Sequence, residues 1–526
     1  MSFFESLPPA CATFSFMILH SATKALSKHH TTRRFATTMA TQHYNALILG
    51  SGQAGTPLAT HIKSLGQSVC LVERAHIAGC CVNEGCTPTK TMVASARMAY
   101  LARRAHEYGV HAGANGDVKI DMPKVRQRKR DIVQSFRGGS EKRLGNAGVD
   151  VVMGSAKFVG EREVEVAVND GGVKRFSADR VFVNVGCRPS RPEIPGLEKV
   201  DQNRVLDSTS VQELGEVPRH LVVIGGGVIG LEFGQLLRRL GAKVTIVQRG
   251  PRLLGKRDDV ELAECMQGIF KEDGIELLLD SKPDHISTSG SDDLPITIKT
   301  SNPATGTTTL EASHILLATG RTPNTDTLNI AAAGILATST GHIKVSPTLE
   351  TNIENIYAIG DVKGGPGFTH VSYDDFRIVR DNIYPADNNP PQTLRTTESR
   401  APYIPSITFT DPQLATIGPP LSTLPSSRTY ITYSMPASWI ARGLETDETR
   451  GIMKAVIDPE TNKVVNFSVI AVEGGEIMSV VQMAMVGGLT WMDLRDGVFA
   501  HPGWAESLNN VWGGERREVK GGGGGT

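Results

Sequence analysis

Residues 46–55 read ALILGSGQAG, so four apolar residues lead directly into a turn that contains three glycines. A turn of the form GxGxxG meets three constraints, because the backbone must reverse tightly, approach a pyrophosphate and let a helix pack on a strand. A helix-compatible stretch and a second apolar run, residues 68–72, follow. We therefore predict a β-α-β unit in which Gly50, Gly52 and Gly55 hold a dinucleotide.

A second turn of this form, GGGVIG at residues 225–230, follows the apolar run 221–224 and precedes the strand-like run 243–247. One such hexapeptide is weak evidence, but two in the same strand–turn–helix setting are much stronger. The first unit also carries Glu73 about 20 residues after its turn, where a carboxylate bonds a ribose hydroxyl. Two units in one chain indicate FAD and a nicotinamide as cofactors. The predicted contacts of the second turn are Gly225, Gly227 and Gly230.

The end of the second strand differs between the two units. After residue 247 come Gln248 and Arg249, with Arg252 nearby and no acid. A carboxylate there favours NADH, whereas arginine pairs with a 2′-phosphate. We predict NADPH as the nicotinamide, with NADH as the alternative if these arginines are ordinary solvated charges.

Residues 79–90, GCCVNEGCTPTK, are the most specific feature of the sequence. Cys81 and Cys86 are separated by four residues and can close a disulfide at the start of a helix. A helix N-terminus lowers the pKa of a thiol and makes a thiolate available. Lys90 follows one turn later and can lie beside a flavin. We predict a redox-active cysteine pair.

With these features in one chain, the sequence resembles the class I pyridine nucleotide-disulfide oxidoreductases, and among them the mercuric-reductase-like flavoproteins; dihydrolipoamide dehydrogenase and glutathione reductase are further members. The stretches CVNEGCTPTKTMVASAR, GDVKGGPGFTHVSYDD and ETDETRGIMKAV carry the resemblance, which covers nearly the whole chain after its first 43 residues. The resemblance implies that Cys81 is the thiol that meets the substrate and Cys86 the thiol against the flavin. It also implies an ion pair between Lys90 and Glu232 near the flavin.

The resemblance assigns four more residues. Asp361, in IGDV, would hold the ribityl chain of FAD, and Gly320 would join the cofactor contacts. His501 and Glu506, in HPGWAE, would be an acid/base dyad supplied by the neighbouring subunit, so the active site would need a homodimer. The chemistry agrees, because thiol exchange near neutral pH needs a proton shuttle and a carboxylate fixes the tautomer of a histidine.

The predicted function is electron transfer from NAD(P)H through FAD and the Cys81–Cys86 pair to a small oxidant, metal or disulfide. No cysteine follows Cys265 and the first 42 residues contain no CxxC, which argues against mercury as the substrate. Bacterial mercuric-reductase-like enzymes that reduce hypothiocyanous acid suggest a detoxifying role. The first alternative is dihydrolipoamide dehydrogenase, although that enzyme usually has an acid at the position of Gln248. The second is a catalytically weak flavoprotein scaffold or redox sensor.

Cys80 stands where the family usually has threonine. It is either a third soft ligand beside Cys81 and Cys86, suited to Cu(I), Hg or As(III), or a small side chain in a packed turn. Cys187 and Cys265 are interpreted as buried hydrophobic residues. We predict no resident metal site.

Composition narrows the class of protein. The 526 residues include 55 basic and 55 acidic residues, a balance that argues against nucleic-acid binding. No apolar run approaches the roughly 18 residues of a membrane span. Residues 1–42 are rich in Ser, Thr and Ala with one acid, Glu5, which is typical of a mitochondrial transit peptide. The alternative is an untargeted, cytoplasmic protein.

The predicted fold class is α/β, with two Rossmann-like dinucleotide-binding domains and a C-terminal α+β dimerisation domain. A stretch rich in Pro, Asp and Ser, residues 191–220, marks one domain boundary, and a linker rich in Pro, Asn and Thr, residues 385–402, leads into the C-terminal domain. The predicted ranges are 44–190 and 314–385 for the FAD domain, 191–313 for the NAD(P) domain, 400–515 for the interface domain and 516–526 for a flexible tail.

Overall fold

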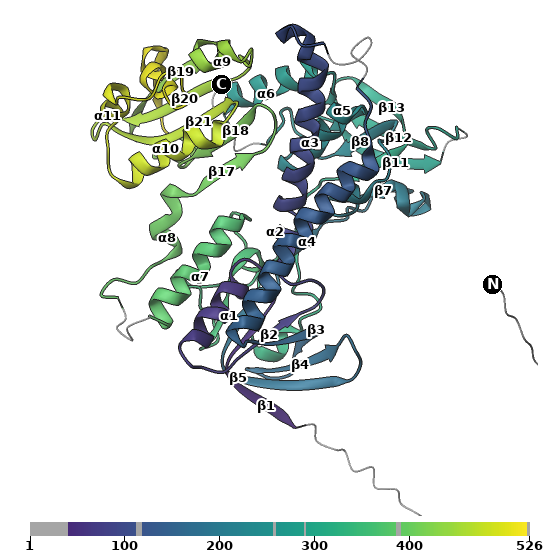
Figure 1. Ribbon diagram of the computed structural model, residues 1–526, viewed down its shortest axis with the longest axis vertical. Coiled ribbons are helices and arrows are strands. Elements are labelled where there is room, and N and C mark those ends of the chain that lie inside the picture. Colours follow the sequence, from purple (N-terminus) through teal and green to yellow (C-terminus); the bar gives the residue numbers. More distant parts are fainter. Residues whose placement is uncertain (1–39, 112–117, 256–258, 289–290, 386–390, 523–526) are drawn as a thin grey trace, which may run out of the picture. The chain divides into compact units, whose positions relative to one another are not determined.

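The computed structural model describes residues 40–111, 118–255, 259–288, 291–385 and 391–522 (Figure 1). The predicted targeting segment, residues 1–42, lies outside these ranges up to residue 39. Thr41 and Gln42 already belong to the first strand, which begins three residues before the predicted start of the FAD domain at residue 44. Within the described ranges, no helix combines the length and apolar character that crossing a membrane requires.

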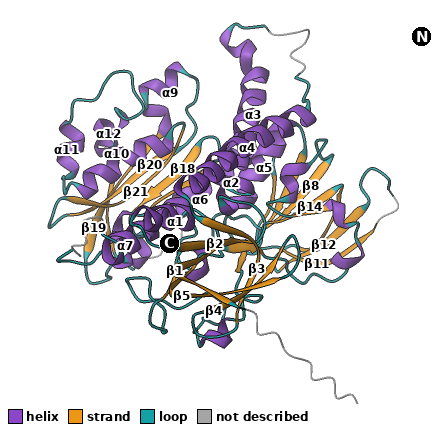
Figure 2. Cartoon of the chain, turned by 60° about the horizontal axis from the view of Figure 1, so that its bottom comes forward, coloured by secondary structure: helices purple, strands orange, loops and turns teal. Residues whose placement is uncertain are grey.

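The first sheet carries the first glycine turn. Strand β1 pairs in parallel with both β2 and β5, and its residues 46–49 are at most 1% exposed, as befits a parallel strand covered on both faces. Helices α1 and α7 share its apolar core (Figure 2). The strands are β1 (Thr41–Leu49), β2 (Val69–Glu73), β3 (Asp150–Phe158), β4 (Glu163–Val168), β5 (Val173–Val183) and β16 (Ile356–Ala358); the helices are α1 (Gly55–Ser64), α2 (Gly79–Asn83), α3 (Cys86–Arg104), α4 (Met122–Ala147) and α7 (Thr369–Ile383).

The second sheet is parallel throughout, in the order β10-β9-β8-β14-β7, and the second glycine turn follows β8. A three-stranded antiparallel sheet, β11-β12-β13, and a ribbon, β6-β15, accompany it. Its elements are β7 (Val205–Leu206), β8 (His220–Ile224), α5 (Val228–Leu240), β9 (Lys243–Val247), α6 (Val260–Glu272), β10 (Glu276–Leu278) and β14 (His314–Leu317); the others are β6 (Cys187–Pro189), β11 (Lys282–Thr288), β12 (Ile296–Asn302), β13 (Gly306–Ala312) and β15 (Arg321–Pro323).

One predicted boundary is wrong. We expected the second segment of the FAD domain to begin at residue 314, but β14 lies between β8 and β7 in the second sheet. A short apolar strand fits any parallel sheet, and only its pairing decides which one it joins. The change of domain therefore falls after Leu317.

The third sheet is antiparallel throughout and forms the C-terminal domain, with α10 packed on it. Its strands are β17 (Pro405–Thr408), β18 (Gln413–Ile417), β19 (Thr429–Pro436), β20 (Ile452–Asp458), β21 (Lys463–Ala471) and β22 (Glu515–Lys520). The helices of this part of the chain are α8 (Thr397–Arg400), α9 (Ala441–Glu445), α10 (Gly474–Val486), α11 (Trp491–Asp496) and α12 (Ser507–Asn510). The fold class is confirmed: two dinucleotide-binding α/β domains and a C-terminal α+β domain.

The predicted flexible tail is also wrong in part. Residues 516–520 belong to β22, which pairs with β19 at the edge of the third sheet. Its many charged residues, in the sequence ERREVK, suit an edge strand because they discourage pairing with another chain. Residues 523–526 lie outside the described residues.

Candidate active site

The first glycine turn follows β1 and begins α1. A Cβ atom on Gly55 would lie 2.2 Å from the carbonyl oxygen of Gly50, so no larger residue fits there without a shift of the backbone. Glu73 ends β2 and folds back on this turn, where its Oε2 accepts hydrogen bonds from the Ser51 N–H at 3.0 Å and the Ser51 hydroxyl at 2.7 Å. The predicted carboxylate is thus fixed beside the turn, as a ribose contact requires.

The second turn repeats this arrangement. A Cβ atom on Gly230 would lie 1.9 Å from the carbonyl oxygen of Gly225, whereas the space beside Gly227 is open. Gln248 directly follows β9, and its Oε1 accepts a hydrogen bond from the Gly226 N–H at 3.0 Å. The strand end therefore presents a neutral amide where the first unit presents a carboxylate.

Two further predicted contacts lie close to these turns. Arg249 is exposed directly after Gln248, and no hydrogen bond or ion pair engages it within the described chain. Gly320 follows β14, and its carbonyl accepts from the Ser190 N–H at 3.0 Å. Of the two positions, Arg249 is the one whose side chain is available to a nucleotide.

The cysteine segment packs directly on the first glycine turn. A Cβ atom on Gly79 would lie 2.5 Å from the Cα of Gly52, so the two backbones touch. Cys81 lies in α2 and Cys86 is the first residue of α3. The sequence thus places both thiols beside the turn that is predicted to hold FAD.

Cys81 and Cys86 are both free thiols, which is the reduced form of the predicted pair. The pKa of Cys86 is lowered to about 6, first by the hydrogen bond from Cys81 and then by Thr369 and Lys90, which outweigh desolvation. The pKa of Cys81 is raised, because that hydrogen bond holds its proton and because the thiol is buried. Near neutral pH the pair holds a thiolate on Cys86 and a proton on Cys81.

Thr369 is a site residue that sequence reasoning missed. Its hydroxyl donates to Cys81 Sγ at 2.9 Å and lies 3.4 Å from Cys86 Sγ. Thr369 is the first residue of α7, so a helix N-terminus also points at the thiol pair. The stretch that contains it was recognised as a family signature, but nothing local in the sequence shows that it faces cysteines nearly 300 residues away.

The predicted ion pair is present. Lys90 Nζ lies 2.7 Å from Glu232 Oε2, and the Glu232 side chain is only 4% exposed. The other carboxylate oxygen accepts from the Phe409 N–H at 2.8 Å, and Lys90 Nζ lies 4.9 Å from the centre of the Phe409 ring. The phenylalanine is a second residue that the sequence did not reveal.

Asp361 lies just after β16, beside the first sheet. Burial raises the pKa of Asp361, and Arg321 opposes this effect. Arg321 also donates to Cys80 Sγ at 3.4 Å, while burial raises the pKa of the Cys80 thiol. Cys187 is buried, as predicted, and burial raises its pKa to about 11. These side chains line the region between the first glycine turn and the ribbon β6-β15.

His501 and Glu506 form the predicted dyad. His501 Nδ1 lies 3.0 Å from both carboxylate oxygens, which leaves Nε2 free. The histidine side chain is 66% exposed. Within the described chain, no hydrogen bond or ion pair joins this dyad to Cys81 or Cys86, so one subunit does not bring acid/base groups and thiols into direct contact.

The residues present fit FAD and a nicotinamide nucleotide. The glycine turns form two cradles in which a Cβ atom would meet backbone, and each is followed by a polar strand end. Gly50, Gly52, Gly55 and Glu73 would hold the adenosine diphosphate part of FAD, with Asp361 and Lys90 farther along. When bound, FAD accepts a hydride from the nicotinamide and passes two electrons to the cysteine pair. The described residues contain no group of three His, Cys, Asp or Glu side chains placed to hold a metal ion.

Two sequence-family matches settle the class of protein. Residues 44–375 match the family described as pyridine nucleotide-disulphide oxidoreductase, and residues 404–511 match the dimerisation domain of the same family. The chain belongs to the pyridine nucleotide-disulphide oxidoreductase family. The protein is therefore a flavin-dependent enzyme that uses FAD and NAD(P)H and acts on disulfide or related groups.

Individual relatives place this oxidoreductase in the mercuric-reductase-like branch. It is 31% identical over 473 residues to the probable pyridine nucleotide-disulfide oxidoreductase RclA of Escherichia coli, covering 89% of this chain and 98% of RclA. It is 33% identical over 467 residues to the mercuric reductase of Bacillus cereus, covering 88% of this chain and 70% of that enzyme. A solved Cu(II) complex of RclA, a HOCl-induced flavoprotein disulfide reductase, matches with a TM-score of 0.79 at 30% identity, covering 90% and 99% of the two chains.

Proposed function

We propose that this oxidoreductase uses NADPH to reduce a small reactive oxidant of the hypohalous or hypothiocyanous acid class. The observation that carries the proposal is the Cys81–Cys86 dithiol with Thr369 bonded to both sulfurs, in a chain with no cysteine after Cys265. Such a site suits an acceptor that needs two thiols only. RclA, which is similar over nearly its whole length, is described as HOCl-induced.

The thiol pair can reduce such an oxidant in two displacements. For an oxidant HOX, the Cys81 sulfur, once its proton is removed, attacks X, and hydroxide leaves and takes up a proton to become water. The Cys86 thiolate then attacks the Cys81 sulfur, which forms the disulfide and releases X⁻. Two electrons pass from sulfur to X, and the cofactors restore the dithiol. Lys90 and Thr369 stabilise the thiolate that the second step needs.

Steady-state assays test this assignment. With NADPH as reductant, we expect hypothiocyanous acid to be consumed at least tenfold more efficiently than lipoamide or Hg(II), as differential transition-state stabilisation of about 1.4 kcal/mol or more implies. A preference for lipoamide with NAD⁺ would contradict the proposal in favour of a dihydrolipoamide dehydrogenase. A Cys86→Ser variant that kept its full biological effect would favour a scaffold or redox sensor instead.

Copper(II) is a second candidate acceptor. It is supported by the similarity to RclA and by a third soft thiol, Cys80, next to Cys81 in the sequence, although the three thiols are not arranged as a metal site within the described residues. RclA has been solved as a Cu(II) complex. If copper is the acceptor, Cys80→Ser should slow Cu(II) reduction and leave hypothiocyanous acid reduction unchanged. If the unsubstituted enzyme and Cys80→Ser reduced Cu(II) at equal rates, Cys80 would have no part in copper reduction.

We further propose a homodimer in which His501 and Glu506 serve the thiols of the other subunit. The support is a dimerisation-domain match and an exposed histidine whose Nε2 is free. Mixing an inactive Cys86→Ser protein with an inactive His501→Ala protein tests it, because hybrid dimers then contain one intact site. Recovery of up to about a quarter of normal activity is expected from statistical mixing of two subunits. No recovery after confirmed exchange of subunits would contradict it.

We also propose that residues 1–42 direct the enzyme to mitochondria. The support is their composition, with four Lys or Arg residues and one acid. A fluorescent fusion of residues 1–42 should enter mitochondria, and a diffuse cytoplasmic signal would contradict the proposal.

A further inference from the structure

Residues 408–412, called here the strap, join β17 to β18 and run along helix α5. The Phe409 N–H donates to Glu232 Oε1 at 2.8 Å. The Asp411 N–H donates to Gln235 Oε1 at 2.8 Å, and the Gln235 amide donates back to the Asp411 carbonyl at 2.9 Å. Glu232 and Gln235 stand three residues apart, on one face of the helix. The strap is therefore bonded to α5 on the same face that carries the active-site glutamate.

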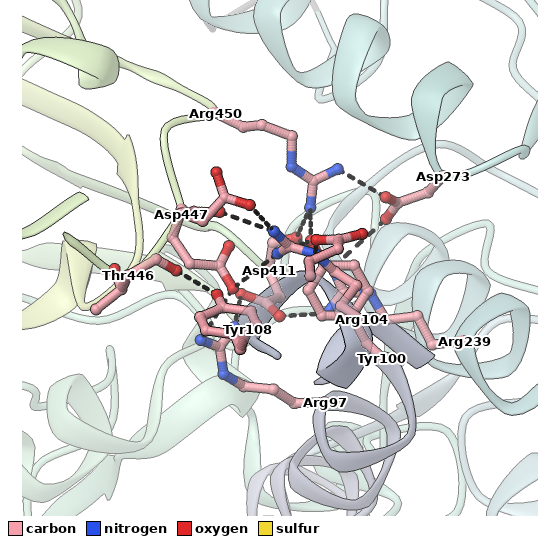
Figure 3. Close-up of polar contacts among 12 residues, drawn as sticks. Arg97, Tyr100, Arg104, Tyr108, Arg239, Asp273, Asp411, Thr446, Asp447 and Arg450 are labelled. Atoms are coloured by element: carbon pink, nitrogen blue, oxygen red, sulfur yellow. Dashed lines mark hydrogen bonds and ion pairs between the residues drawn. The ribbon is translucent and has the colours of Figure 1, made fainter. Parts of the chain in front are cut away.

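The carboxylate of Asp411 adds two ion pairs to the contact between the strap and the helices. It pairs with Arg239 of α5 and with Arg97 of α3, and Arg239 also donates to the Asp411 carbonyl at 2.9 Å (Figure 3). Arg239 stands seven residues after Glu232, and Arg97 stands seven after Lys90. Seven residues are about two helical turns, so both arginines lie on the same helix faces as the ion pair.

Asp411 is thus buried between two helices that must keep their relative position. It is 8% exposed, and Arg239 and Arg97 hold its pKa below the usual range although burial acts in the opposite direction. Removing one partner of such a buried group leaves charge uncompensated, which is strongly destabilising. Helix α3 carries Cys86 and helix α5 carries Glu232, so a loss of Asp411 acts on both sides of the redox site.

We propose that Asp411 is a positioning residue of the redox site: it fastens the strap to α3 and α5 and thereby holds Glu232 in its ion pair with Lys90. Glu232 has one oxygen on Lys90 and the other on the strap, so the strap sets the direction of its carboxylate. Lys90 favours the Cys86 thiolate and Glu232 disfavours it. Asp411 keeps these two opposing charges in place, because it holds the strap that fixes Glu232 beside Lys90. This role concerns the thiol pair itself and holds for any electron acceptor.

The test is the pH dependence of long-wavelength absorbance in the two-electron-reduced holoenzyme, which reports a Cys86 thiolate against oxidised FAD. In Asp411→Asn the midpoint should move to lower pH by about half a unit, because a Glu232 carboxylate that is no longer held disfavours the thiolate less. Glu232→Gln should move it in the same direction. In the Glu232→Gln background, Asp411→Asn should add nothing, because the two act through one contact.

Asp447→Asn is the matched control. Asp447 pairs with Arg104 in the same arginine cluster, its side chain is 65% exposed, and it makes no hydrogen bond or ion pair with residues 408–412 (Figure 3). In Asp447→Asn, the pH midpoint of the long-wavelength absorbance should move by less than about 0.2 unit, since exposed charges are screened. Equal shifts in Asp411→Asn and Asp447→Asn, or an undiminished shift in the Glu232→Gln background, would overturn the proposal.

A second variant covers the case in which Asp411→Asn does not fold. Gln235→Met has a similar shape and removes both hydrogen bonds to the Asp411 main chain. It also removes a hydrogen bond to Asp273, whose carboxylate keeps its ion pairs with Arg239 and Arg450. It should shift the midpoint in the same direction. A folded Gln235→Met enzyme with an unchanged midpoint would contradict the role of the strap.

Discussion

The two glycine turns share one backbone design. Gly50 and Gly225 have φ of +104° and +116°, a region that favours glycine. A Cβ atom on either would lie 2.3 or 2.4 Å from the carbonyl oxygen of the residue that follows the adjacent parallel strand, Asn184 or Ala318. The same steric demand therefore recurs in two domains with different sequences.

The two units differ in the side chain that meets the turn from the second strand. Glu73 is the last residue of β2 and Gln248 directly follows β9, and both accept a hydrogen bond from the second residue of their turn. One brings a negative charge and the other does not. The backbone thus decides that a dinucleotide binds, and the side chain at the strand end helps to decide which one.

The largest effects are expected from the last glycine of each turn. Gly55→Ala should yield protein without FAD, whereas Gly230→Ala should keep FAD but lose flavin reduction by NADPH by about a hundredfold, because the new Cβ displaces backbone. Flavin absorbance per protein and stopped-flow reduction measure the two losses. Loss of the same cofactor in both variants would show that the turns have been assigned wrongly.

Gln248→Glu makes the second unit resemble the first. A carboxylate there repels a 2′-phosphate, so kcat/KM for NADPH should fall roughly ten- to a hundredfold, with little change for NADH. Gln248→Met, which has a similar shape and no charge, is the control. Equal losses with both nucleotides in Gln248→Glu would argue that Gln248 does not face the 2′ position.

Acid should affect the thiols and not the turns. Residues 50–55 and 225–230, with Glu73 and Gln248, include no histidine or cysteine. Cys86 reacts as a thiolate, which is present above its pKa of about 6 and is protonated as the pH falls. Oxidation of the reduced enzyme by its acceptor should therefore slow by about tenfold per pH unit below 6. Flavin reduction by NADPH should change little over that range, and a parallel decline in both half-reactions would contradict this.

Glu73→Gln should have the smallest effect. The amide oxygen can still accept from Ser51, but the charge that strengthens these hydrogen bonds is lost. We expect the dissociation constant of FAD to rise by about three- to tenfold, measured by titrating apoprotein with FAD. If Glu73→Gln weakened FAD binding as much as Gly55→Ala does, the carboxylate, and not the backbone, would govern binding.

Local signals made much of the site predictable. The His501–Glu506 dyad was implied by the family resemblance, whereas the residues of each glycine turn, like Cys81 and Cys86, lie within a few residues of one another along the chain. Their spacing therefore carries the chemistry without knowledge of the fold. The pairing of Lys90 with Glu232 was implied by family resemblance and is present in the structure.

Contacts between distant segments were not predictable from local patterns. Thr369 meets cysteines from another domain segment, and Asp411 meets arginines of two helices, although nothing local in the sequence shows which distant residues either one faces. The same limit explains β14 and β22. An apolar tetrapeptide does not encode which parallel sheet it joins, and many charged residues are shared by solvated tails and edge strands.

The most direct test of the central claim is an anaerobic titration of the purified holoenzyme with NADPH, and separately with NADH, followed by the flavin spectrum. The account predicts a long-wavelength band after two electrons, because a Cys86 thiolate then lies against oxidised FAD, with NADPH the better reductant. Direct bleaching of the flavin without that band would show that Cys81 and Cys86 do not lie in the electron path, and would contradict the account.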